Sequence, residues 1–180
     1  MTVPFIVYLF MMFGNISVAT PPMADYTRLE NVIILSVAGF GLVLLLYSVV
    51  HLWREKSDGL VTSGPYRLVR HPQYFALILF TLMMTYQSVW ILRNTFGIGW
   101  LTADQTLILW YMMLVAYAAI AWIEESHLLK TFGNEWSEYR SRTGFLIPFV
   151  RFRLFVVEGV LSIAIPIVIM HLLLLLPVIL

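Results

Sequence analysis

The sequence contains no cysteine, and charged residues make up only 12% of its 180 positions. Without a thiol the protein can form no disulfide bond, no thiolate metal site and no cysteine nucleophile. Soluble domains carry about 25% charged residues, so the scarcity of charge argues against a soluble fold. The net charge of +1 gives no electrostatic reason to expect a nucleic acid as partner.

Hydrophobic residues are abundant instead: they make up 61% of the chain, and the mean hydropathy is +0.87. A helix needs roughly 20 apolar residues to cross a bilayer. Five stretches meet or approach that length, and they predict an all-α, polytopic membrane helix bundle that forms one domain over residues 1–180. The predicted spans are residues 4–20, 32–53, 74–92, 106–123 and 155–180. The last contains Glu158 near its start and Pro166 inside it. The sequence does not decide whether this span is tilted or kinked.

Basic residues fall mainly in two connections, the one after the second predicted span and the one after the fourth. Only Arg28 and Arg93 lie elsewhere, so the positive-inside rule predicts that both connections face the cytoplasm. Five spans then place the N-terminus inside and the C-terminus outside. Two polar segments that share one side of the membrane can form a single site.

The first polar segment, residues 59–74, runs from a stretch rich in Gly, Ser and Pro directly into an apolar helix. Arg70, His71, Gln73 and Tyr74 crowd the first turn of that helix. Free backbone N–H groups and the positive end of the helix dipole suit an anionic ligand group there. The alternative interpretation is that the basic residues of this segment only contact lipid headgroups. Because polar residues at the edge of a bilayer are costly, the segment is a functional candidate.

The second polar segment, residues 124–140, begins where an apolar run ends. Glu124 and Glu125 directly follow this run, at a position where negative charge opposes the dipole of the preceding helix. A solvated helix end is the simpler interpretation. Otherwise a cationic partner has to compensate, either an amine or sulfonium ligand or Arg70 or His71 of the first segment.

Metal and nucleotide motifs are weak or absent. Glu124 and His127 have the Glu-x-x-His spacing of di-iron bundles, but such sites need a second copy and further carboxylates, which this chain lacks. The sequence contains no His-Glu-x-x-His and no Gly-Lys-Ser/Thr motif. We therefore predict no metal site.

The first polar segment resembles the isoprenylcysteine carboxyl methyltransferase family and, more broadly, the phospholipid methyltransferases. The resemblance lies in the run Leu-Val-Thr-Ser-Gly-Pro-Tyr at 60–66 and the run Arg-His-Pro-Gln-Tyr at 70–74. Three later features resemble the C-terminal block of that family. They are the Glu124–Glu125 pair, the Phe-Gly-Asn-Glu-Trp run at 132–136 and the Gly-Phe-Leu-Ile-Pro-Phe run at 144–149. The likeness covers residues 59–149, half of the chain. Arg-His-Pro-x-Tyr followed at this distance by Glu-Glu is more specific than either motif alone. The small size of the chain suggests a prokaryotic-type member.

The resemblance implies an integral membrane enzyme that uses S-adenosylmethionine and releases S-adenosylhomocysteine, with residues 59–149 as the cofactor-binding core. It implies that Glu124 pairs with the ammonium of the cofactor and that His71 and free N–H groups bind its carboxylate. Tyr66 and Tyr74 offer aromatic surface and hydroxyls for adenine and ribose. The implied cofactor-binding residues are Leu60, Val61, Tyr66, Arg70, His71, Pro72, Gln73, Tyr74, Glu124 and Glu125.

The acceptor implied by the resemblance is a lipophilic or lipid-modified molecule that enters from the bilayer. Family members that methylate prenylcysteine carry a basic residue just before the Glu-Glu pair, where this chain has the apolar Ala119 and Ile120. Prenylcysteine is therefore expected to be a poor substrate. A second departure is Ala76, at a position where the family often has Gly.

The identity of the acceptor decides whether a base is needed. A carboxylate or thiolate is already nucleophilic, so no general base is assigned for such an acceptor. A phospholipid amine must lose a proton, and Glu125 or His127 could take it. A sterol reductase-like enzyme with a nicotinamide cofactor, which shares a His-Pro-x-Tyr-like segment, and a small transporter are further alternatives.

Overall fold

The computed structural model describes residues 29–57, 59–94, 100–152 and 154–175. Throughout these ranges the regular structure is helical, without a strand, which confirms the all-α prediction. The elements in chain order are α2 (Leu29–Glu55), the short 3-10 helix η2 (Gly64–Arg67), α3 (Pro72–Asn94), α4 (Ala103–Arg142) and α5 (Phe155–Leu175).

Four helices of the described chain are long and apolar enough to cross a membrane, namely α2, α3, α4 and α5. They correspond to the second through fifth predicted spans. The first predicted span, residues 4–20, lies outside the described residues. The sequence pattern therefore located each of the four described spans.

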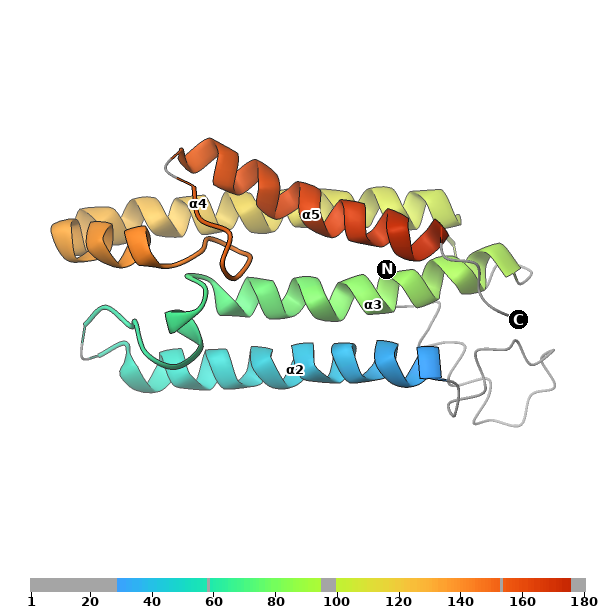
Figure 1. Ribbon diagram of the computed structural model, residues 1–180, viewed down its shortest axis with the longest axis horizontal. Helices are drawn as coiled ribbons and strands as arrows, with labels where there is room; N and C mark the ends of the chain where they lie inside the picture. The colour runs from blue at the N-terminus through green and yellow to red at the C-terminus, as the bar shows by residue number, and fades with distance from the viewer. Residues whose placement is uncertain (1–28, 58, 95–99, 153, 176–180) are drawn as a thin grey trace.

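The four long helices lie side by side along the longest axis of the molecule, with α3 between α2 and the α4–α5 pair (Figure 1). A larger share of α3 is buried than of any other of these helices. α2 approaches α3 closely at Gly41, where an added Cβ would lie 3.0 Å from the carbonyl oxygen of Ala76. Ala76, where the family often has Gly, thus packs against a glycine of the neighbouring helix.

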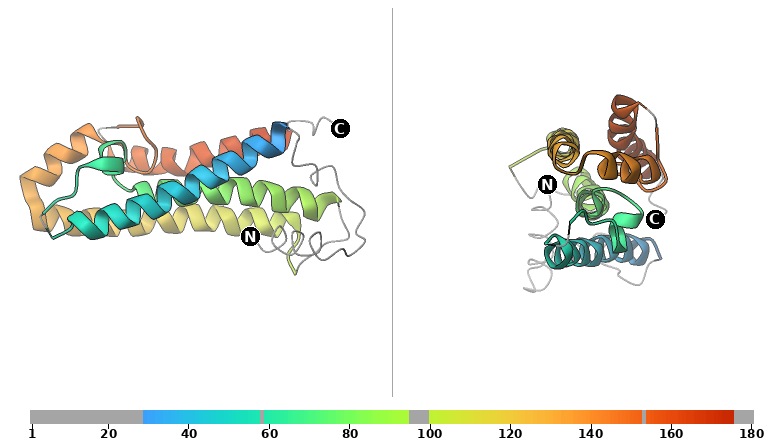
Figure 2. Two further views of the ribbon diagram at one scale, coloured as in Figure 1. Left: turned by 90° about the horizontal axis from the view of Figure 1, so that it is seen from below. Right: turned by 90° about the vertical axis from the view of Figure 1, so that its left-hand side faces the viewer.

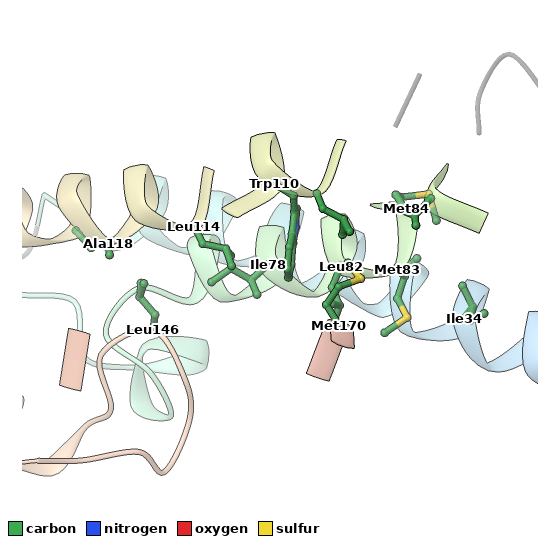
Figure 3. Packing of buried hydrophobic residues seen from close by; sticks show 14 of the residues in the cluster. Ile34, Ile78, Leu82, Met83, Met84, Trp110, Leu114, Ala118, Leu146 and Met170 are labelled. Atoms are coloured by element: carbon green, nitrogen blue, oxygen red, sulfur yellow. The ribbon is translucent and has the colours of Figure 1, made fainter. Parts of the chain in front are cut away.

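The apolar core is built from side chains of all four helices, as Figure 3 shows for Ile34, Ile78, Leu114 and Met170. Trp110 is fully buried at its centre and donates a hydrogen bond from Nε1 to Thr81 Oγ1 at 3.1 Å. This bond satisfies the indole N–H, which would otherwise be costly to bury.

α4 extends well beyond the predicted span 106–123 and is bent near its end. Thr102 and Gln105 form a capping box at its start. Gly133 interrupts the helical backbone with φ 51°, a conformation that favours glycine. The segment after Gly133, which we call the α4 arm (residues 134–142), folds back toward the bundle (Figure 2). The bend brings the second polar segment over the first.

Candidate functional site

The two polar segments meet at one end of the bundle, on the side where α2 ends and α3 begins (Figure 1). Val69 and Gly144 form an isolated parallel bridge, and the N–H of Arg70 donates to the carbonyl oxygen of Gly144 at 2.8 Å. From the α4 arm, the Tyr139 hydroxyl donates to the carbonyl oxygen of Tyr66 at 2.6 Å. Segments about seventy residues apart are thus fixed to each other by a backbone bridge and by a side-chain hydrogen bond to the backbone.

Arg70 is the buried centre of this end of the molecule. Its Nε donates to Glu125 Oε1 and its Nη2 to Glu158 Oε2, both at 2.6 Å. Its Nη1 donates to the carbonyl oxygens of Arg140 at 3.1 Å and Thr143 at 2.5 Å. All three ionised side chains of this network are at most 3% exposed. The guanidinium therefore links the start of α3 to α4, to the end of the α4 arm and to α5.

His71 lies between two carboxylates. Its Nδ1 is 3.1 Å from Glu124 Oε2, and its Nε2 is 3.4 Å from Glu125 Oε1. Burial lowers the pKa of His71, but the hydrogen bonds and charges of the two glutamates outweigh this effect and raise its pKa above the ordinary value. The two glutamates thus favour the charged form of His71, which lies between them.

Glu124 is the carboxylate that remains accessible. Tyr74 donates a 2.6 Å hydrogen bond to Oε1, while His71 contacts Oε2. The Glu124 side chain is still 40% exposed, compared with 3% for Glu125. Its orientation is therefore fixed, while part of the carboxylate can still bind a cationic ligand.

A cavity of about 470 Å³ lies between the two polar segments and the end of α2, and we call it the donor cavity. This volume is in the range of about 300–1,000 Å³ typical of small-molecule sites. Its wall consists of Leu52, Lys56, Gly59, Leu60, Val61, Tyr66, Arg70, His71, Gln73, Ile123, Glu124, His127, Leu128, Phe132, Trp136 and Tyr139.

Most residues selected from the sequence lie on the wall of the donor cavity, and three do not. The wall includes Leu60, Val61, Tyr66, Arg70, His71, Gln73 and Glu124. Pro72 is buried at the first position of α3, Tyr74 reaches the site through its bond to Glu124, and Glu125 is buried against Arg70. These three residues support the wall from behind.

The start of α3 offers fewer free N–H groups than the sequence suggested. Pro72 has no N–H, and the N–H groups of Tyr74 and Phe75 both bond to the carbonyl oxygen of His71 at 3.1 Å. The N–H of Arg70 is used by Gly144. These N–H groups are therefore already bonded within the protein, and the binding of a ligand carboxylate at this helix start stays a prediction.

Five residues on the wall of the donor cavity were not expected from the sequence to bind a cofactor. They are Lys56, His127, Phe132, Trp136 and Tyr139. From the sequence, Lys56 is one of the basic residues that predict the orientation of the chain in the membrane. The signal that could have identified it is its position between a span and the turn-rich segment. Trp136 and Tyr139 reach the cavity only because the α4 arm folds back.

The loop that forms one wall of the donor cavity is tied to α2. His51 Nε2 lies 2.8 Å from Ser63 Oγ, and the Ser63 hydroxyl donates to Glu55. Next to this cluster, Gly64 has φ 56°, and an added Cβ would lie 2.7 Å from His51 Nε2. Glycine is therefore required at this position for both reasons. Ser63 and Glu55 both contact Nε2 of His51. In a hydrolytic triad the serine and the carboxylate contact opposite ring nitrogens, so this cluster is not such a triad.

Ala119 and Ile120 are exposed on α4, and neither lies on the wall of the donor cavity. Both side chains face away from the described part of the bundle. A basic residue at either position would therefore point away from the donor cavity, so the absence of one says little about an acceptor bound beside it.

Comparison with known proteins gives one distant relative. The chain is 26% identical over 105 residues to protein-S-isoprenylcysteine O-methyltransferase B of Arabidopsis thaliana, and the match covers 54% of this chain and 43% of the plant protein. No family model and no solved structure matches the chain. The similarity supports a methyltransferase, and together with four span-length helices it supports an integral membrane protein.

Proposed function

We propose that the protein is an S-adenosylmethionine-dependent methyltransferase of the isoprenylcysteine carboxyl methyltransferase type, a short prokaryotic-type member that acts on a lipophilic acceptor. The observation that carries this proposal is Glu124. Its half-exposed carboxylate is held by Tyr74 and His71 on the wall of the donor cavity. The distant plant relative adds independent support for methyl transfer.

The charges on the wall of the donor cavity fit the amino acid end of this cofactor. Arg70 and His71 are already engaged with carboxylates. Glu124 and the exposed Lys56 remain, one anion and one cation, to pair with an ammonium and a carboxylate. The apolar and aromatic wall, which includes Val61 and Phe132, suits the adenosine end.

When bound, S-adenosylmethionine supplies a methyl group that the lone pair of an acceptor takes by in-line displacement, with the C–S electrons returning to sulfur. The residues of this chain would then contribute mainly by positioning the reactants and excluding water. A carboxylate or thiolate acceptor needs no general base. Glu125 is unsuited to act as a general base, because it is buried against Arg70. The basic residues at this end of the bundle favour the cytoplasmic side, and a lipophilic acceptor would arrive laterally between helices.

A second candidate is methyl transfer to a phospholipid amine. His127 is exposed and lies on the wall of the donor cavity, so a base is available there for the proton that an amine must lose. Methyl transfer from isotope-labelled cofactor into lipid extracts, analysed by mass spectrometry, separates ester, thioether and amine products.

The purified protein is expected to bind S-adenosylhomocysteine with roughly micromolar affinity, about 8 kcal/mol. Saturating ligand should raise its thermal unfolding temperature in detergent, because ligand binds only the folded state. NADPH serves as the matched control for a reductase. A shift with NADPH and none with S-adenosylhomocysteine would refute the proposed function.

Lys56→Gln is expected to weaken S-adenosylhomocysteine binding about five- to tenfold, since a charge-assisted contact to the ligand carboxylate is lost at a partly exposed site. Arg54→Gln is the control, because Arg54 is also exposed and lies two residues away but does not line the donor cavity. Calorimetry in detergent measures both variants. Equal affinities would show that Lys56 does not contact the ligand.

A further inference from the structure

A second cavity, of about 460 Å³, lies between the α4 arm and the residues that lead into α5. We call it the arm cavity. Arg140 and Ser141 of the arm form one side, and Arg151 and Phe152 form the other. Trp136, which is only 2% exposed, lies on the walls of both cavities and separates them. The arm cavity is therefore distinct from the donor cavity.

The arm cavity is rich in positive charge. Arg151 is exposed on its wall and has no ion pair within the described ranges. Arg140 is stacked over the Phe155 ring at 4.5 Å, and its Nε lies 3.8 Å from Glu125 Oε2. One carboxylate, Glu158, also lies on the wall, but Arg70 binds it at 2.6 Å.

The charge balance leaves the arm cavity positive. Among the described residues here, three guanidinium groups face two carboxylates, so one positive charge is uncompensated. The guanidinium groups are those of Arg70, Arg140 and Arg151, and the carboxylates are those of Glu125 and Glu158. The cavity also lies at the N-terminal end of α5, where the helix dipole is positive. Guanidinium groups favour phosphate, because their planar N–H pairs match two of its oxygens.

The surroundings of the arm cavity indicate where such a phosphate comes from. Two exposed apolar side chains, Leu129 and Phe152, lie on its wall, and the exposed Leu154 and Val156 follow Phe152 closely in the sequence. A free phosphate ion makes no favourable contact with these apolar side chains, whereas the acyl chains of a lipid can cover them. Basic pockets between membrane helices are known to bind anionic lipid headgroups.

We propose that the arm cavity binds the phosphate group of an anionic membrane lipid, with Arg151 as its main charged contact and Arg140 as the second. The lipid would join the α4 arm to the start of α5. This binding does not require the protein to be a methyltransferase.

The test is native mass spectrometry of the full chain in detergent, titrated with phosphatidylglycerol, with diacylglycerol as the uncharged control and with inorganic phosphate. Retention of phosphatidylglycerol in preference to diacylglycerol is expected. Arg151→Gln should weaken retention of phosphatidylglycerol about five- to tenfold, and Arg151→Lys should restore part of it. Because Arg151 is exposed, neither substitution should prevent folding.

Arg142→Gln is the matched control, since Arg142 lies on the same arm but is exposed and paired with Glu138 outside the cavity. Equal retention of the two lipids, or equal losses with Arg151→Gln and Arg142→Gln, would overturn the proposal. Binding of inorganic phosphate without any preference for phosphatidylglycerol would identify a soluble anion and overturn the lipid assignment. S-adenosylhomocysteine binding, measured in parallel, tests the donor cavity separately.

Discussion

Replacing Arg70 by alanine is expected to destabilise the protein by about 3–5 kcal/mol. The reason is that Glu125 and Glu158, both at most 3% exposed, would lose their shared cation and remain as buried, uncompensated charges. The carbonyl oxygens of Arg140 and Thr143 would lose their donor as well. Thermal or denaturant unfolding in detergent measures the change.

Arg67→Ala provides the control, because Arg67 is exposed on the same segment and is expected to change stability by less than about 0.5 kcal/mol. A further variant identifies the cause. Combining Arg70→Met with Glu125→Gln and Glu158→Gln should recover part of the loss, because the unpaired charges are removed. Similar stabilities for Arg70→Ala and Arg67→Ala would show that the network does not hold this end of the bundle together.

Glu124→Gln is expected to weaken S-adenosylhomocysteine binding by about 2 kcal/mol, or roughly 30-fold. The amide keeps an oxygen for the Tyr74 hydroxyl but carries no charge for the ligand ammonium. The 40% exposure of Glu124 limits the effect to less than a fully buried pair would show.

Glu135→Gln and Glu138→Gln are the matched controls, because both residues are exposed on the α4 arm and neither lines the donor cavity. Calorimetric titration in detergent should give nearly unchanged affinities for them. Equal losses for all three substitutions would indicate a general electrostatic effect and would contradict a direct contact by Glu124.

The sequence by itself determined the class of structure and the segments that form the site. Apolar runs of span length predicted α2, α3, α4 and α5, because crossing a bilayer leaves little freedom in length and composition. The polar segments 59–74 and 124–140 stood out for the same reason, since polar residues beside apolar spans are costly.

Only the tertiary structure decided what each polar residue does. Glu124 and Glu125 are neighbours in the sequence, but successive residues of a helix point about 100° apart. One therefore faces the donor cavity, while the other is buried against Arg70. The bend at Gly133 and the position of Glu158 across from Arg70 depend on contacts between distant segments, which hydropathy and motif spacing do not encode. The same packing brought Lys56 to the wall of the donor cavity and placed Arg151 beside the arm cavity, without an ion pair to any residue that the structure describes.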